Sequence, residues 1–257
     1  MIRLKTKEEI EKMKIAGRVV AMILQEAKEY MKIGANALDV ELLAEKILNE
    51  NGCKPAFKGY GGYPYITNIS VNEEVIHGFP LKKKVFKNGD IVSIDVGAIY
   101  QGYYGDGAYT YIVGETDEIG RKLVATTQEA LMQAIKIIKP GIKLGDISHA
   151  VQQYVEERGF GVVREFVGHG VGRELHEDPQ VPNYGRPGTG VTLRKGMTIA
   201  IEPMVTEGGW HVEILEDGWT VVTEDRKRAA HFEHSVAVTE DGYEILTVLD
   251  EQRGYIR

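Results

Sequence analysis

Four acidic residues stand next to segments whose other residues are of the kind that proteins bury. Asp95 follows the apolar segment 91–94, and Glu202 follows the similar segment 198–201. Asp106 and Glu233 lie in or beside the strand-like segments that come next along the chain. A carboxylate in such a setting is costly unless it is paired or binds a cation. A solvated turn explains any one of these acids, but the four together favour a metal site.

The four acids are related by an internal repeat. Asp95 and Glu202 are separated by 107 residues, and the same offset relates the helix-flanking residues Gly34, Asp39 and Gly52 to Gly141, Asp146 and Gly159. If the two halves pack about a pseudo-two-fold axis, Asp95 faces Glu202 and Asp106 faces Glu233. Carboxylates so close together would hold protons unless a multivalent cation lay between them. Oxygen-rich ligands suit Mn, Fe, Co or Mg better than a structural zinc.

A histidine completes this set. His169 stands in the segment 168–172, where glycines alternate with it and with a valine. Glycines disfavour a helix, so the segment predicts tight backbone that presents one imidazole. Beside four acids, His169 is interpreted as a fifth ligand.

Two further histidines have no metal-ligand spacing. His77 and His176 are either ordinary polar loop residues or donors to developing negative charge and to a leaving amine. Nothing in the sequence around His231 indicates either catalytic role, and His231 is interpreted as structural.

The elements that must position these residues also occur twice. Thr6 and Glu9 form a capping-box pattern before an amphipathic helix that runs to about residue 32, and a second helix opens near Asp39. Helical patterns return after Thr116 and from Asp146. Segments 91–96 and 108–113 read as a hairpin, and 198–202 and 235–239 as its equivalent. We therefore expect an α+β fold in one domain over residues 1–257, with repeats at about 6–113 and 116–240, each having two helices on antiparallel strands.

Composition excludes several classes of protein. A hydrophobic fraction of 43% and a charged fraction of 27% are ordinary for a globular chain. The net charge of −7 argues against nucleic-acid binding through bulk electrostatics. One cysteine excludes an internal disulfide, and the apolar run 19–24 is too short to span a bilayer. With no signal-peptide pattern at the N-terminus, these features predict a cytoplasmic protein without a membrane segment.

The sequence from about Ile2 to Glu244 resembles the type I methionine aminopeptidases, which have the pita-bread fold. The resemblance rests on the segments 76–78, 95–97, 105–106, 168–172, 201–203 and 232–234. It implies that two divalent metal ions (Co, Mn, Fe or similar) bind Asp95, Asp106, His169, Glu202 and Glu233. It also implies that Asp106 and Glu233 bridge the two ions.

The same resemblance implies removal of the initiator methionine from nascent proteins whose second residue is small. Glu202 would accept a proton from the attacking water, His176 would steady the oxyanion, and His77 would contact the amide of the second residue. A methionine pocket is implied at Phe57, Tyr60, Tyr63, Asn68, Leu175 and Trp219. Several relatives have cysteine in place of Asn68 and phenylalanine in place of Leu175, which bears on the pocket's shape. The expected partners are peptides with N-terminal methionine. The resemblance also allows a contact with the ribosome, and the expected oligomeric state is a monomer.

Two alternatives share this fold. A proline-specific aminopeptidase or dipeptidase would carry a large additional N-terminal domain, whereas the first repeat here begins by about residue 6. A non-catalytic binding protein would have lost metal ligands, and this chain keeps all five. The chain also lacks the zinc-binding extension and the large helical insertion of other methionine aminopeptidases, so we expect a bacterial-style, minimal form.

Overall fold

The computed structural model describes residues 1–249 and has helices and strands in mixed order. The helices are α1 (Lys7–Ala27), α2 (Ala37–Glu50), α3 (Glu118–Lys136) and α4 (Leu144–Glu156), with 3-10 turns η1 (Lys28–Tyr30) and η2 (Tyr60–Gly62). The strands of the first half are β1 (Lys54–Pro55), β2 (Thr67–Val71), β3 (Glu74–Ile76), β4 (Ile91–Tyr100) and β5 (Tyr103–Ile112). Those that follow α4 are β6 (Gly161–Val162), β7 (Gly168–Gly170), β8 (Glu177–Val181), β9 (Thr198–Ile201), β10 (Met204–Thr206), β11 (Val212–Ile214), β12 (Val221–Thr223), β13 (Ala229–His231), β14 (Glu233–Val238) and β15 (Tyr243–Ile245).

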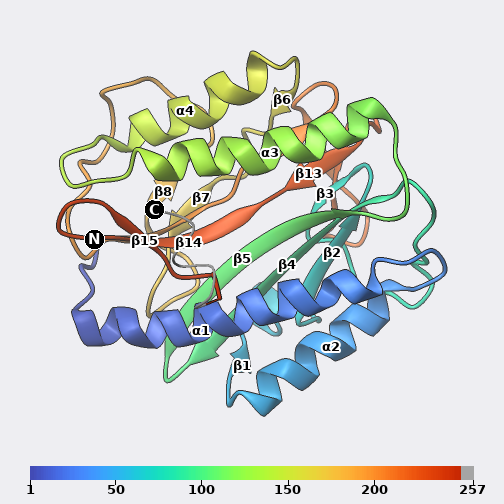
Figure 1. Cartoon of the computed structure of the whole chain (residues 1–257), viewed down its shortest axis with the longest axis horizontal. Helices are drawn as coiled ribbons and strands as arrows, with labels where there is room; N and C mark the ends of the chain where they lie inside the picture. The colour runs from blue at the N-terminus through green and yellow to red at the C-terminus, as the bar shows by residue number, and fades with distance from the viewer. Residues whose placement is uncertain (250–257) are drawn as a thin grey trace.

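One large antiparallel sheet dominates the molecule. Its strands follow the order β1-β4-β5-β14-β9-β7-β8, with β2 paired to β4 and β15 paired to β14. Two three-stranded sheets, β13-β10-β6 and β11-β12-β3, complete the described strands. In the view of Figure 1 the pair α3 and α4 lies above the middle of the sheet and the pair α1 and α2 below it. The predicted α+β architecture of two helix pairs with antiparallel strands is confirmed.

The helices are fixed by local signals and by their buried faces. Thr6 and Glu9 form the predicted capping box, in which each side chain bonds the other residue's backbone N–H. α1 packs so closely on the segment that follows β15 that a Cβ added to Gly17 would lie 2.4 Å from the carbonyl oxygen of Leu246. A Cβ on Gly105 would lie 2.5 Å from the nitrogen of Gly17, so both positions require glycine.

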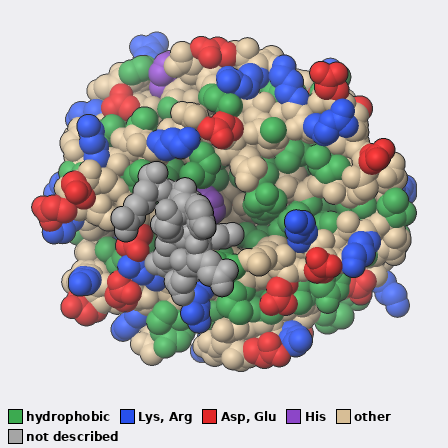
Figure 2. Space-filling model, viewed as in Figure 1, with side chains coloured by type: hydrophobic (Ala, Val, Ile, Leu, Met, Phe, Trp, Pro, Cys, Tyr) green, Lys and Arg blue, Asp and Glu red, His purple; other side chains and the backbone are tan. Residues whose placement is uncertain are grey.

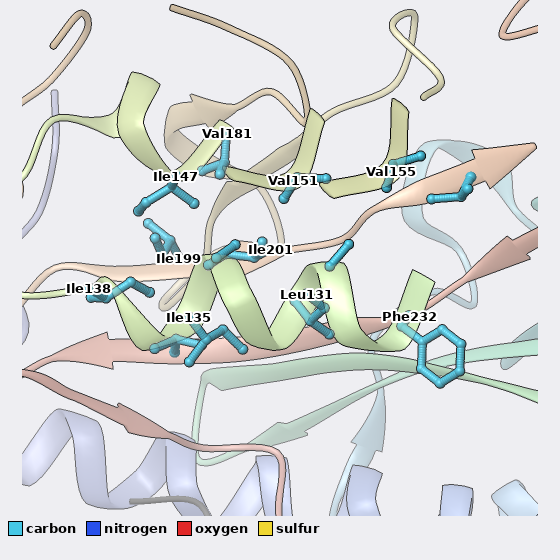
Figure 3. Close-up of a cluster of buried hydrophobic side chains, with 14 of the residues drawn as sticks. Leu131, Ile135, Ile138, Ile147, Val151, Val155, Val181, Ile199, Ile201 and Phe232 are labelled. Carbon is cyan, nitrogen blue, oxygen red and sulfur yellow. The ribbon is translucent and has the colours of Figure 1, made fainter. Parts of the chain in front are cut away.

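The core of the second half lies between α3, α4 and the sheet. Figure 3 shows Leu131 and Ile135 of α3 and Val151 of α4 pointing toward Ile199 and Ile201 of β9. These five side chains are at most 2% exposed. Removing so much apolar surface from water holds β9 firmly, and the residue after β9 is Glu202.

Element boundaries differ from the sequence prediction by a few residues. α2 begins at Ala37, because Asn36 caps it and Asp39 is already inside the first turn. α4 likewise begins before Asp146, whose carboxylate accepts the N–H of Lys143. α3 is capped by Asp117, not by Thr116. The hairpin strand β5 starts earlier than residue 108, since its pairing with β4 extends back to Tyr103.

Charged residues of both signs are interspersed over the face shown in Figure 2. Among the helices of residues 1–249, none combines the length and the apolar character that crossing a membrane requires.

Candidate metal centre

Four adjacent strands bring the four acids together. β4 and β5 carry Asp95 and Asp106, β14 begins with Glu233, and Glu202 directly follows β9. In the sheet order β4-β5-β14-β9, the inner strands carry Asp106 and Glu233 and the outer strands lead to Asp95 and Glu202. The sheet therefore gathers, at one place, acids that lie up to 138 residues apart in the chain.

Hydroxyl side chains fix the seam between β5 and β14. Ser235 Oγ donates to the carbonyl of Asp106 at 2.8 Å and accepts its N–H at 3.1 Å. Thr110 Oγ1 makes the same double contact with His231, donating to its carbonyl at 2.6 Å and accepting its N–H at 3.0 Å. These links hold the backbone of Asp106 and the approach to Glu233 in place.

Three of the predicted ligands already have the spacing of a metal site. One ligand atom each from Asp106, His169 and Glu233 lies within 4.8 Å of the others, and all three residues are buried. His169 Nε2 also lies 3.4 Å from a Glu202 oxygen. His169 Nδ1 is 2.9 Å from the carbonyl of Gly170 and must donate to it, because a carbonyl only accepts. That tautomer leaves Nε2 with a free lone pair facing the carboxylates, as a metal ligand requires.

The protein itself leaves several oxygens of these carboxylates without hydrogen-bond donors. Asp95 Oδ1, Asp106 Oδ1 and Glu233 Oε1 are buried without a hydrogen-bond partner. Buried polar atoms are normally paired, so oxygens of this kind need a ligand from outside the chain. Carboxylate oxygens with one imidazole nitrogen are a donor set that fits divalent Mn, Fe or Co.

The electrostatics of the cluster support the same conclusion. Burial raises the pKa of Asp95 to about 7, against the opposing hydrogen bond from Asn68. Burial, followed by the negative charge of neighbouring acids, raises the pKa of Asp106, Glu202 and Glu233 well above the ordinary range. Burial lowers the pKa of His169 to about 3, which keeps the ring neutral. A bound cation would relieve the repulsion and stabilise the ionised carboxylates.

All thirteen residues proposed for the site from the sequence line one pocket. The pocket holds about 480 Å³ of space open to solvent, within the usual range for a small-ligand site. At its base are the five candidate metal ligands Asp95, Asp106, His169, Glu202 and Glu233. Its walls are the predicted substrate-binding residues Phe57, Tyr60, Tyr63, Asn68, His77, Leu175, His176 and Trp219.

The walls are built mainly from aromatic rings. Tyr63 meets Trp219 edge to face with ring centroids 5.1 Å apart, and its hydroxyl donates to the carbonyl of Thr67 at 3.0 Å. Phe57 can approach because Gly97 lacks a side chain, since a Cβ there would lie 2.9 Å from the Phe57 ring. The result is an apolar slot that ends at the carboxylates.

The two catalytic histidine candidates also line this pocket. The His176 ring centroid is 4.2 Å from that of His169, and His176 Nδ1 is 2.7 Å from the hydroxyl of Tyr60. His77 has a positive φ of 59°, a strained conformation of the kind found at functional sites. Burial lowers the pKa of His77 to about 4 and also lowers the pKa of His176, so both rings are neutral near pH 7.

The structure adds residues to the site that the sequence analysis did not assign to it. His231 Nε2 is buried without a partner, 3.8 Å from a Glu202 oxygen. A signal was present, because residues 231 and 233 share one face of an extended segment. Asn183 donates to the carbonyl of Glu202 at 3.0 Å, and Asn68, already proposed as a wall residue, also donates to Asp95 at 2.8 Å. These two contacts join segments far apart in the sequence, and no local pattern indicates them.

Comparisons with known proteins agree with this site. A sequence model of metallopeptidase family M24 matches residues 11–240. Methionine aminopeptidase 1 of Bacillus subtilis is 49% identical over 247 residues, which is 96% of this chain and 99% of that protein. A crystal structure of methionine aminopeptidase from Thermotoga maritima is similar with 65% identity and a TM-score of 0.96, over 96% of this chain and 100% of that one. Prolidase from Pyrococcus furiosus is 28% identical with a TM-score of 0.77, and the match covers 96% of this chain but 66% of that one.

Proposed function

The chain belongs to metallopeptidase family M24, and from that membership we infer that it is an aminopeptidase that removes N-terminal methionine from proteins and peptides. Its fold is the pita-bread fold that the sequence resemblance implied. One observation carries the inference: an apolar, aromatic-lined pocket ends at a buried cluster of four carboxylates and one imidazole. Full-length matches to methionine aminopeptidases, against a partial match to prolidase, favour this activity over the proline-specific alternative.

We propose that two divalent metal ions are held by Asp95, Asp106, His169, Glu202 and Glu233. Asp106 and Glu233 occupy the two inner strands, which supports a bridging role for them. Bound there, the ions would lower the pKa of a water molecule and polarise the scissile carbonyl. Co, Mn and Fe all suit this donor set, so its chemistry leaves the physiological metal open.

The chain's own residues supply the remaining steps. Glu202 accepts the proton of the attacking water, a role that suits a carboxyl whose pKa is raised by burial. His176 donates to the carbonyl oxygen as negative charge develops on it. His77, which lines the same pocket, contacts the amide of the second residue.

The methionine side chain occupies the aromatic slot. Sulfur makes favourable contacts with aromatic rings, and Tyr63 and Trp219 present such rings. Leucine and norleucine should be poor substrates but not inactive ones, since one methylene changes binding by only about 1–3 kcal/mol. A small second residue is required because His77 and His176 crowd the next position.

This activity indicates where in the cell the protein acts. N-terminal methionine is removed from nascent proteins, so we place the enzyme in the cytoplasm as a monomer with access to the ribosome.

The test is hydrolysis of a peptide series, assayed by the amino acid released. Met-Ala-Ser should be cleaved, and Met-Leu-Ser and Lys-Ala-Ser should be cleaved far more slowly. A chelator should abolish cleavage of Met-Ala-Ser, and added Mn or Co should restore it. Equal cleavage of Met-Ala-Ser and Lys-Ala-Ser, or a preference for Met-Pro-Ser, would overturn the proposal.

A further inference from the structure

The loop that carries His176 is held from within by a glutamate. The loop lies between β7 and β8 and bears both Leu175 and His176 of the pocket. Glu177 Oε1 accepts the backbone N–H of Arg173 at 2.7 Å and that of Glu174 at 3.3 Å. One carboxylate oxygen thus closes the loop on itself directly beside His176.

The other oxygen of that carboxylate is bound by Lys5. Lys5 Nζ and Glu177 Oε2 form an ion pair in which the side chains are 3% and 6% exposed. The lysine is itself held, because its backbone N–H donates to the carbonyl of Gly196 at 2.7 Å. Its side chain lies against Gly172, where a Cβ would come within 2.2 Å of Lys5 Cε. The pair therefore attaches the loop to a fixed part of the molecule.

A second contact from the N-terminal region reaches the same loop. Glu9, in the first turn of α1, accepts hydrogen bonds from Arg173 Nε at 3.0 Å and from the hydroxyl of Tyr103 at 2.8 Å. The backbone N–H of Tyr104 donates to the carbonyl of Gly172 at 2.8 Å. The start of the loop is thus pinned, and Glu177 secures its end.

We propose that the buried Lys5–Glu177 pair is a positioning device that holds His176 in its catalytic orientation. Neither residue of the pair is among those that line the pocket base or walls. The pair acts through the loop backbone. This inference rests on the proposed function, because the orientation it secures is the one needed to donate to the oxyanion. A misplacement of about 1 Å in such a group can lower a rate by about 10²-fold.

The test begins with Lys5→Met, which keeps the length of the side chain and removes its charge. We expect turnover of Met-Ala-Ser to fall by roughly 10²-fold, since a displaced donor loses most of its effect, while metal content stays at the wild-type level. Lys195→Met is the matched control, because it breaks an exposed ion pair with Glu240 and neither residue lines the pocket. That control should keep wild-type turnover.

A second variant separates positioning from general loss of structure. Glu177→Gln keeps an oxygen that can accept the two backbone N–H groups but carries no charge. Combined with Lys5→Met, it removes the uncompensated buried charge but does not restore the link to the loop, so the double variant should regain thermal stability while its turnover stays low. Recovery of turnover together with the thermal unfolding temperature would contradict the proposal.

The decisive measurement is a double-variant cycle with His176→Ala. If Lys5 acts through His176, Lys5→Met should lower turnover at most about two-fold further once His176 is absent. Multiplicative losses in the double variant would overturn the inference. The imidazole NMR signals of His176 in the metal-free protein provide a readout apart from activity, and Lys5→Met should shift or broaden them. Failure of the wild-type protein to cleave Met-Ala-Ser would instead refute the proposed function, whatever the NMR signals show.

Discussion

At the scale of single residues, we propose that His176 donates to developing charge without binding metal. Its ring lies beside that of His169, yet its Nδ1 bonds the hydroxyl of Tyr60. Its pKa is lowered by burial, so the neutral ring is present at working pH.

Replacing His176 by alanine should therefore lower turnover by roughly 10²–10³-fold, the usual scale for one oxyanion donor. Metal content, measured by elemental analysis, should stay at the wild-type level. His211→Ala serves as control, because His211 stacks on Trp210 with ring centroids 3.8 Å apart and does not line the pocket. Loss of metal in the His176 variant, with activity restored by added Mn, would show that His176 is a ligand.

Asn68 has a second task beside lining the methionine pocket. It stands directly opposite Asp95 in the β2–β4 register and donates to Oδ2 of that carboxylate. The donation favours the ionised form of Asp95, the form that binds metal.

We predict that Asn68→Ala weakens metal binding by roughly 10–100-fold, the range found when an outer partner of a ligand is removed. Titration calorimetry with Mn would measure it. Leu175→Ala is the matched control, since Leu175 lines the pocket without bonding a ligand, and should change the selectivity for methionine over leucine at constant metal affinity. If the affinity for Mn is unchanged in Asn68→Ala, Asn68 acts only as a residue of the pocket wall.

Much of the candidate site could be predicted because its residues conflict with their surroundings. Asp95 and Glu202 are charged residues attached to buried strands, and such a conflict can be seen in the sequence alone. Asn68 and Asn183 are compatible with many environments, so their contacts with Asp95 and Glu202 become apparent only in three dimensions. His231 is interpreted as structural from the sequence, although its extended segment puts it on the same face as Glu233 and it lies beside Glu202.

At the scale of elements, the repeat extends to backbone details. Gly34, Gly52 and Gly89 have positive φ, and so do Gly141, Gly159 and Gly196, which are related to them by the offset of 107. The isolated bridges Asn36–Val85 and Lys143–Thr192 are related by the same offset. We propose that residues 6–113 and 116–240 derive from one duplicated unit. Strand periodicity could not give the full length of β5, because its glycines carry no hydropathy signal.

Gly17 provides a test of how tightly α1 must pack. Alanine is the better helix former by about 1 kcal/mol, which alone would stabilise α1. Its methyl group would, however, meet the carbonyl of Leu246, and such overpacking costs about 1–3 kcal/mol. We expect Gly17→Ala to lower the free energy of unfolding, measured by urea titration. Lys46→Ala on the exposed face of α2 should leave it within about 0.5 kcal/mol, and equal stability of both variants would argue against close packing at Gly17.

At the scale of the whole molecule, the buried carboxylates make stability depend on pH and metal together. A carboxyl whose pKa is raised on folding stabilises the protein below its unfolded pKa, and that contribution is lost as pH rises through the folded pKa. This loss begins near pH 4, where the unfolded carboxyls ionise, and for Asp95 it continues to the folded pKa of about 7. Asp106 and Glu233, whose pKa values are also raised well above the ordinary range, add to it. Histidines with lowered pKa, such as His169, are neutral in both states above about pH 6.5 and add no slope there.

The metal-free protein should accordingly lose stability as the pH rises from 6.5 through the pKa of Asp95 at about 7. The expected slope is about 1.4 kcal/mol per pH unit for each proton that the folded state retains and the unfolded state releases. Urea unfolding in the presence of a chelator would measure it. With saturating Mn the slope should vanish, because the cation takes the place of the protons. A flat profile without metal would mean that the cluster is ionised on its own.

The seam between the two halves of the sheet has a mechanical consequence. β5 and β14 share the register pairs Glu233–Ala108 and His234–Gly107, whereas β4 and β5 pair along their full length. Asp95 and Asp106 lie on one side of this seam, and His169, Glu202 and Glu233 on the other. Metal ions held by residues from both sides of the seam would cross-link the halves. Amide hydrogen exchange along β5 and β14 should then proceed by parting of the halves, and bound metal should slow it far more than exchange in α2, which lies remote from the seam.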